Sequence, residues 1–122
     1  MKDMTILLED RPGTLAEVAE VLGKAGVNIE GGCGYPAIGR GIFHILVENE
    51  NTARTALEGA GITVSEVNNV IVLDIENQPG NLAAELRKIS SEGVNATLFY
   101  IASNNRIVLA VDDFDKAKAL LG

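Results

Sequence analysis

The sequence has no tryptophan, only three phenylalanines and two tyrosines, and a single cysteine and a single histidine among its 122 residues. One cysteine excludes an internal disulfide and any zinc site built from several cysteines, and it agrees with a reducing compartment. So few aromatic rings disfavour a surface on which bases stack. We therefore expect a thin, mainly aliphatic core.

Positive charge is also scarce and scattered. Ten Lys and Arg residues stand against 17 Asp and Glu residues, which gives a net charge of −7, and the bases never form a run. Nucleic-acid binding needs a basic face to neutralise phosphates, and anionic membranes attract the same kind of face. We expect neither partner. The N-terminal residues show no long apolar segment, signal peptide or lipidation pattern, which predicts a cytoplasmic protein.

An internal repeat is the most informative feature of the sequence. Residues 9–16 (EDRPGTLA) align with residues 76–83 (ENQPGNLA), so that Pro79 follows Pro12 by 67 residues. The same offset relates Gly-Val-Asn at residues 26–28 to Gly-Val-Asn at residues 93–95. Because the register persists across the length of a helix, chance does not explain it.

Both copies predict the same elements. An apolar run precedes Pro-Gly, a helical period follows it, and a glycine ends the helix; a hairpin and a short second helix come next. The expected strands are residues 4–8, 27–31, 41–47 and 62–67 in the first copy and residues 70–75, 94–102 and 106–111 in the second, and the expected caps of the short helices are Asn51 and Asp113.

This order predicts an α+β fold of two ferredoxin-like (βαββαβ) modules in tandem, residues 1–68 and 69–122. Each module is expected to have an antiparallel sheet with its helices on one face, and the second to lack its last strand. A missing strand leaves an unpaired sheet edge, and such edges tend to be covered. We therefore expect a homodimer.

The glycine-rich residues 32–40 are expected to form a long hairpin loop in the first copy. They fit the pattern G-x-G-x-x-A, but no helix follows, as a dinucleotide site requires. One interpretation is a flexible flap in which Tyr35 or Cys33 contacts a ligand, and the other is an exposed loop. His44 is expected to pack or to lie on a strand face, since one histidine cannot build a metal site. We expect no metal and no cofactor.

Residues 10–18 (DRPGTLAEV), followed by residues 26–30 (GVNIE), resemble the opening of an ACT domain. The chain is similar to the regulatory subunits of acetolactate synthase and to small stand-alone tandem ACT-domain proteins. The resemblance implies an allosteric, non-catalytic protein that binds an amino acid at a module interface, beside the loop into the first helix and the start of the second strand. The implied contacts are Asp10, Arg11, Pro12, Gly13, Thr14, Leu15, Asn28 and Ile29, with Asn77, Gln78, Pro79, Gly80, Asn81, Leu82 and Asn95 in the second copy.

The chemistry of these residues suits a zwitterion. A helix N-terminus offers unpaired N–H groups and partial positive charge to a carboxylate, and Gly13 lets a ligand approach the backbone. On this basis Gly13→Val is expected to weaken ligand binding without unfolding the chain. Asn28 could contact both ends of the ligand, and Asp10 could pair with its ammonium. The alternative is that these residues are ordinary helix-start signals.

Three functional hypotheses follow. The first is a sensor that binds an amino acid and changes how subunits pack. The second is a subunit that only pairs with a biosynthetic enzyme and has no ligand of its own. The third is a small enzyme using Cys33, although no base lies near that thiol in the sequence and no other catalytic residues are recognisable. The second copy, with Asn77 in place of an acid, could be structural.

Overall fold

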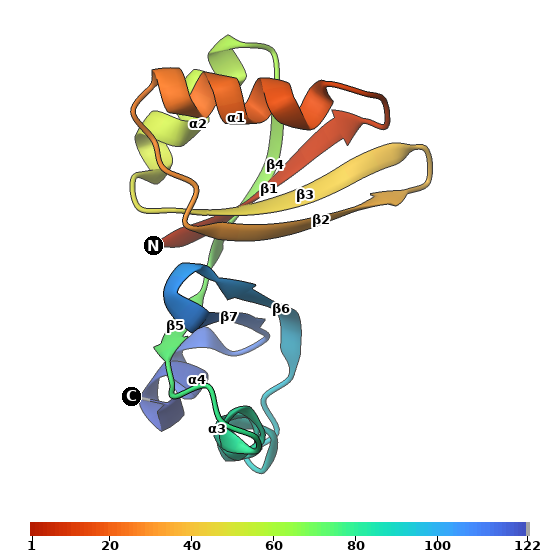
Figure 1. The fold of residues 1–122 in the computed structure, drawn as a ribbon. Coiled ribbons are helices and arrows are strands. Elements are labelled where there is room, and N and C mark those ends of the chain that lie inside the picture. Colours follow the sequence, from red (N-terminus) through yellow and green to blue (C-terminus); the bar gives the residue numbers. More distant parts are fainter. Residues whose placement is uncertain (122) are drawn as a thin grey trace. The chain divides into compact units, whose positions relative to one another are not determined.

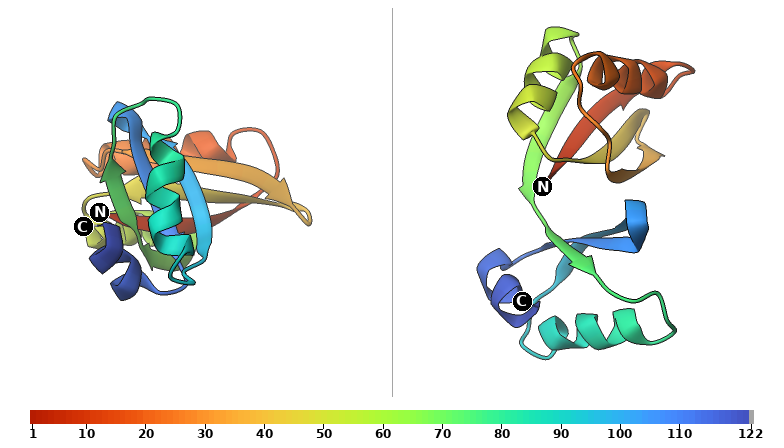
Figure 2. Two further views of the ribbon diagram at one scale, coloured as in Figure 1. Left: turned by 90° about the horizontal axis from the view of Figure 1, so that it is seen from below. Right: turned by 60° about the vertical axis from the view of Figure 1, so that its left-hand side comes forward.

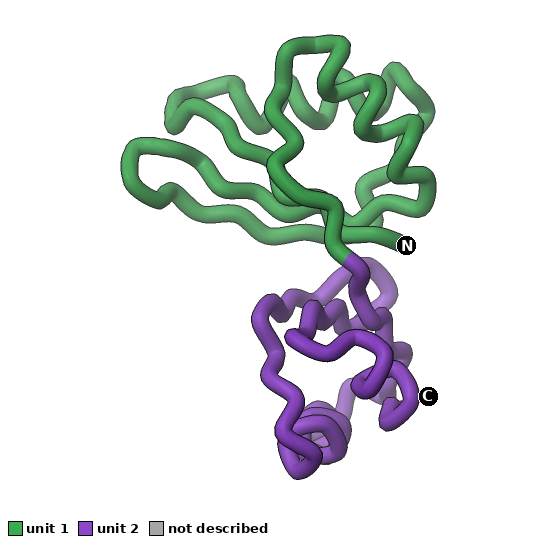
Figure 3. The backbone as a smooth tube through the Cα atoms, turned by 180° about the vertical axis from the view of Figure 1, so that it is seen from behind, with its two compact units in different colours: residues 1–68 green, residues 69–122 purple. Residues whose placement is uncertain are grey.

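A computed structural model describes residues 1–121. The chain divides into two compact units, Met1–Asn68 and a second that begins at Asn69 (Figure 3). Each unit has its own hydrophobic core of strand and helix side chains.

The first unit contains four strands and two helices in the order β-α-β-β-α-β. They are β1 (Lys2–Glu9), α1 (Thr14–Lys24), β2 (Gly31–Ala37), β3 (Arg40–Val47), α2 (Glu50–Gly59) and β4 (Thr63–Asn69). The strand order is β4-β1-β3-β2, and β3 is antiparallel to both β1 and β2. Both helices lie on one face of this sheet (Figure 1). Alternate side chains of β1, among them Met4 and Ile6, are buried beneath them because successive strand residues face opposite ways.

The second unit follows the same order but has no strand after its last helix within the described residues. Its elements are β5 (Ile71–Asp74), α3 (Asn81–Ser90), β6 (Ala96–Ala102), the short 3-10 turn η1 (Ser103–Asn105), β7 (Arg106–Val111) and α4 (Phe114–Leu121). Antiparallel pairs place β7 between β6 and β5. Helices α3 and α4 pack against each other (Figure 2). β5 is therefore an edge strand. Its outer edge is equivalent to the edge of β1 that pairs with β4 in the first unit.

Glycines end three of the helices, and two of them, Gly26 and Gly93, were predicted from the sequence. Gly26, Gly61 and Gly93 have φ values of 73°, 76° and 79°, in the left-handed region that glycine adopts without strain. After each one, the next N–H bonds back to a carbonyl five residues earlier, as Val27 does to Leu22 at 2.9 Å. This is the Schellman arrangement of a helix end.

The prediction for the first hairpin was wrong. Residues 32–40 are not a long loop, because Gly31–Ala37 form strand β2 and the turn consists of Ile38 and Gly39, with φ values of 51° and 75°. The glycines allow close packing: a Cβ on Gly32 would lie 2.2 Å from the His44 carbonyl oxygen, and one on Gly34 would lie 2.0 Å from the Phe43 ring. Glycine inside a strand marks such close approaches.

The predicted cap of the short helix in the first unit was also displaced. Helix α2 begins after Asn49, whose Oδ1 accepts a hydrogen bond from the Thr52 N–H at 3.0 Å, so the cap is Asn49 and not Asn51. In the second unit Asp113 is the cap, since its Oδ1 accepts a bond from the Lys116 N–H at 3.2 Å. Both side chains satisfy N–H groups that the first turn of a helix leaves unpaired.

Candidate functional site

The loops that enter α1 and α3 have the same backbone conformation. Gly13 has φ 92° and ψ −14°, and Gly80 has φ 89° and ψ −16°. Each loop also contains the same backbone hydrogen bond just before its Pro-Gly. The Arg11 N–H donates to the Glu9 oxygen, and the Gln78 N–H donates to the Glu76 oxygen, both at 2.9 Å. The sequence repeat is therefore a repeat of loop geometry.

This geometry explains why residue 13 is a glycine. Nothing lies within 4 Å of a Cβ built on Gly13 or Gly80, so space is not what requires glycine here. The positive φ requires it, because a side chain in the left-handed region costs about 1–2 kcal/mol, and more for a β-branched residue. Gly13→Val would thus strain the fold directly, contrary to our expectation that it would affect only ligand binding.

Neither helix N-terminus is capped by a side chain. The residues placed to do so turn back into the loop. The Thr14 hydroxyl donates to the carbonyls of Glu9 at 2.9 Å and Arg11 at 3.1 Å, and Asn81 Nδ2 donates to the Glu76 carbonyl at 2.9 Å. Thr14 and Asn81 therefore hold the loop shape, and the first-turn N–H groups keep their positive partial charge without a side-chain acceptor.

The charged residues of the first loop are exposed and partly paired. Arg11 Nε lies 2.6 Å from Glu9 Oε2, and the hydrogen bond to Glu9, with its charge, raises the pKa of Arg11. Asp10 and Pro12 are exposed, and Leu15 is 47% exposed. The pocket beside this loop is lined by Leu7, Leu8, Glu9, Gly39, Arg40 and Thr63, and none of these belongs to the predicted set.

The second loop borders a pocket of about 110 Å³ within its own unit. Three predicted residues, Asn77, Gln78 and Leu82, line it. The other lining residues, which sequence reasoning missed, come from the end of β5 and from the β6–β7 hairpin: Ile75, Glu76, Ile101, Asn105 and Ile107. Pro79, Gly80 and Asn81 shape the adjoining loop.

Asn28 and Asn95 lie at the other end of the helix from these loops. They follow the C-termini of α1 and α3, and helices of 11 and 10 residues are about 15 Å long at 1.5 Å per residue. Asn28 and the neighbouring Ile29 therefore cannot touch the same amino acid as Gly13 within one unit. The Asn28 amide donates to Glu30, and the Asn95 N–H donates to Asp112 Oδ1 at 2.9 Å.

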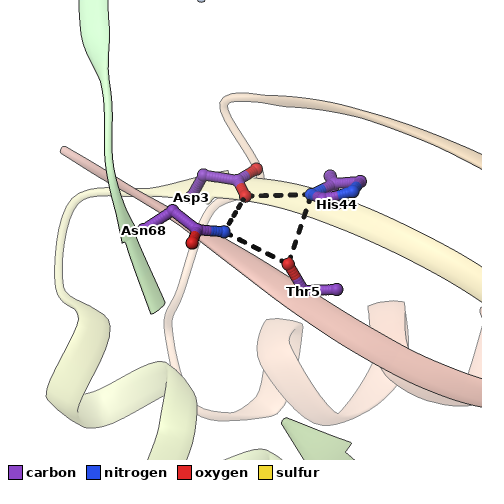
Figure 4. A network of polar contacts seen from close by, with 4 residues as sticks. All are labelled: Asp3, Thr5, His44 and Asn68. Carbon is purple, nitrogen blue, oxygen red and sulfur yellow. Dashed lines mark hydrogen bonds and ion pairs between the residues drawn. The ribbon is translucent and has the colours of Figure 1, made fainter. Parts of the chain in front are cut away.

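A buried polar network in the first unit was not predicted as a group (Figure 4). Asp3 is 0% exposed, and its Oδ2 lies 2.9 Å from His44 Nδ1 and accepts a bond from Asn68 Nδ2 at 3.0 Å. Asn68 Nδ2 also donates to Thr5 Oγ1 at 3.2 Å. His44 is thus part of a packed strand face, as expected; its partners Asp3 and Thr5 lie in β1, and Asn68 joins the network from β4.

Cys33 does not have the environment of a reactive thiol. It lies in strand β2, directly opposite His44 in β3, and not in a flexible flap. Burial raises the pKa of the Cys33 thiol, and the charge of Asp3 raises it further. A higher pKa lowers the thiolate fraction at neutral pH, and the thiolate is the nucleophile.

Residues 1–121 contain no group of three or more His, Cys, Asp or Glu side chains arranged to hold a metal ion. None of their helices combines the length and the apolar character needed to cross a membrane.

Comparison with known proteins places the chain in a family. Residues 1–121 match the ACT domain pair family. A search of curated proteins found no match. A protein of Bacteroides thetaiotaomicron of known structure is 32% identical, with a TM-score of 0.89 over 98% of this chain and 85% of that one. The ligand-free regulatory subunit of aspartate kinase from Thermus thermophilus has the same fold, with 21% identity and a TM-score of 0.72 over 98% of this chain and 87% of that one. The chain belongs to the ACT domain pair family.

Proposed function

We propose that this protein is a non-catalytic, cytoplasmic regulatory protein made of two ferredoxin-like ACT modules, residues 1–68 and 69–122, which senses a small amino acid. The observation that carries the proposal is the duplicated strand-to-helix loop. In both units a left-handed glycine precedes a helix whose N-terminus has no side-chain cap. Such an N-terminus binds a carboxylate, and Asp10 or Glu76 beside it can pair with an ammonium group.

The proposed ligand lies at an interface between modules or subunits. The predicted contacts fall at both ends of α1 and of α3, too far apart to meet on one amino acid within a unit. Residues from both ends can contact one ligand only if different units or copies contribute them. A ligand bound in this way favours the arrangement it bridges, which is how binding would become a signal.

The likeness to an aspartate kinase subunit supports regulation as the role. That protein is a regulatory subunit of aspartate kinase from Thermus thermophilus, and its likeness to this chain is one of fold. The same likeness also favours the alternative that the chain pairs with a separate biosynthetic enzyme and has no ligand of its own. The raised pKa of Cys33 disfavours the enzymatic alternative.

Thermal-shift screening against the twenty amino acids tests this proposal. A ligand at 100 times its Kd should stabilise the folded state by about 2.7 kcal/mol, so one or a few amino acids should raise the Tm by several degrees. No shift with any of them, together with co-purification of an enzyme, would instead support the pairing alternative. Turnover that Cys33→Ser abolishes would contradict a non-catalytic role.

We also propose that the protein is a homodimer in which a second copy covers the β5 edge. A groove of about 430 Å³ follows this edge, lined by Val70 to Ile75 and by Glu85, Phe114, Lys118 and Leu121. In the first unit a strand, β4, lies at the equivalent edge. Antiparallel pairing of two β5 strands about a two-fold axis would keep the two Asp74 carboxylates apart, whereas parallel pairing would place them side by side.

Light scattering at micromolar concentration should give twice the 12.9 kDa mass of the chain. Leu121→Glu should shift the protein to monomers, because it places a charge in the groove that the second copy would desolvate. Arg54→Ala, on the exposed side of α2, serves as the control and should leave the mass unchanged. A monomeric wild-type protein would refute the dimer.

A further inference from the structure

The pocket of the second unit is lined by both aliphatic and polar residues. Ile75, Leu82, Ile101 and Ile107 supply the aliphatic surface. The polar residues of the lining are Glu76, Asn77, Gln78 and Asn105. The lining residues include no Lys, Arg or His.

Strand register identifies the equivalent positions in the first unit. Ile107 pairs with Leu73 on β5 as Phe43 pairs with Ile6 on β1, and Leu73 follows Ile6 by the repeat offset of 67 residues. On the hairpins, Ile101 pairs with Ile107 and Gly34 pairs with Phe43. The first unit therefore has Phe43 in place of Ile107 and Gly34 in place of Ile101.

The Phe43 ring lies over the equivalent hairpin positions of the first unit. A Cβ on Gly34 would lie 2.0 Å from Phe43 Cδ1, and a Cβ on Gly41 would lie 2.7 Å from Phe43 Cε2. The ring thus lies directly against both glycines, and it packs on the core of the first unit. The backbones of the two loops match, but at these hairpin positions the first unit has a core-packed aromatic ring where the second has two isoleucines that line its pocket.

We propose that the two units are not equivalent receptors: the second unit alone accepts the side chain of the ligand, and that side chain is small and aliphatic. The inference rests on the proposed function, since it assigns the side-chain pocket of that site to one unit and names its ligand class. The backbone N–H groups at the start of α3 hold the carboxylate, and Glu76 holds the ammonium.

The size and charge of the pocket select the ligand class. The pocket has a volume of about 110 Å³, and its four aliphatic residues suit the branched side chains of valine, leucine and isoleucine, which have three or four non-hydrogen atoms. An acidic side chain would meet Glu76 and no cation among the lining residues. A lysine side chain would place its charge among four aliphatic residues, which costs desolvation energy. Burying a branched aliphatic side chain contributes about 1.5–3 kcal/mol.

Isothermal titration calorimetry of the whole protein with L-valine, L-leucine, L-isoleucine, L-aspartate and L-lysine tests the inference. We expect binding of at least one aliphatic amino acid, with one site per chain and an affinity at least tenfold above that for aspartate or lysine. The double variant Ile101→Gly/Ile107→Phe copies the arrangement of the first unit and should weaken binding at least tenfold. Phe43→Leu, in the first unit, is the matched control and should bind as the wild type does.

A second variant tests the inference even if the double variant misfolds. Ile101 is 59% exposed at the rim of the pocket, so Ile101→Trp should fold normally by circular dichroism and should close the pocket. Two sites per chain, unchanged affinity in Ile101→Trp, or loss of binding only in Phe43→Leu would overturn the inference while leaving amino-acid sensing intact. A wild-type protein that binds none of the twenty amino acids would instead refute the proposed function.

Discussion

Replacing Gly32 with alanine should lower the free energy of unfolding of the first unit by about 3 kcal/mol or more. The new methyl group would lie 2.2 Å from the His44 carbonyl oxygen and 3.3 Å from its carbonyl carbon. A backbone carbonyl cannot rotate away as a side chain can, so β2 must separate from β3 and lose hydrogen bonds of the ladder. Urea denaturation, with hydrogen exchange of the β2 and β3 amides, measures the effect.

The matched control is Gly23→Ala in helix α1. Nothing lies within 4 Å of a Cβ at Gly23, and its φ is not positive. Alanine is the better helix former by about 1 kcal/mol, so this substitution should stabilise the unit. Equal effects of the two substitutions would show that β2 and β3 do not pack as closely as described.

Asp3→Ala should destabilise the first unit by about 3 kcal/mol, because it removes one partner from a buried polar network. Asn68 Nδ2 and His44 Nδ1 would lose a common acceptor at 3.0 and 2.9 Å, in a region where Asp3 itself is not exposed at all. Both would keep only Thr5 Oγ1, at 3.2 and 3.4 Å, and polar groups that lose a hydrogen bond without returning to water keep their desolvation cost. The midpoint of urea unfolding and the exchange of the β1 amides report this loss.

Asp10→Ala removes an exposed carboxylate from the same unit and should change stability by less than about 0.5 kcal/mol. If Asp3→Ala proved equally mild, the network would not be closed to water. A double-mutant cycle with Asn68→Ala then measures the coupling between the two residues, which we expect to be about 1 kcal/mol or more.

The order of elements could be predicted from the sequence because its signals are local. An apolar strand, Pro-Gly, a helical period and a terminal glycine follow one another within about 25 residues, and the repeat doubles each signal. The left-handed Gly26 and Gly93 confirm the predicted helix ends. Boundaries moved where two signals competed, as at Asn49 and Asn51, since either residue type can cap a helix.

Strand β2 could not be predicted in the same way, because the residues that explain its glycines lie in another strand. Glycines at positions 32 and 34 resemble a loop in isolation. Their role becomes visible only when β3 is placed beside them, with the His44 carbonyl and the Phe43 ring against the backbone. The Asp3 network has the same origin, since its hydrogen bonds join residues 41 to 65 positions apart.

The candidate site was predictable in its loop and not in its lining. Asn77, Gln78 and Leu82 are at the repeated motif and do line the pocket, whereas Ile101 and Ile107 carry no motif. The sequence did contain a signal for these two residues. When the hairpins are aligned, Phe43 corresponds to Ile107 and Gly34 to Ile101, so one position is larger and its neighbour is smaller in the first unit. Without strand register, nothing shows that these exchanges adjoin the loop.

The matching backbone of the two Pro-Gly turns has a consequence for how this protein can diversify. Its left-handed glycines tolerate little substitution, while the neighbouring hairpin positions carry residues as different as Gly34 and Ile101. A change of ligand preference would then require replacements in the hairpin and none in the turn. Recognition can drift between descendants while the most constrained stretch of chain is inherited intact.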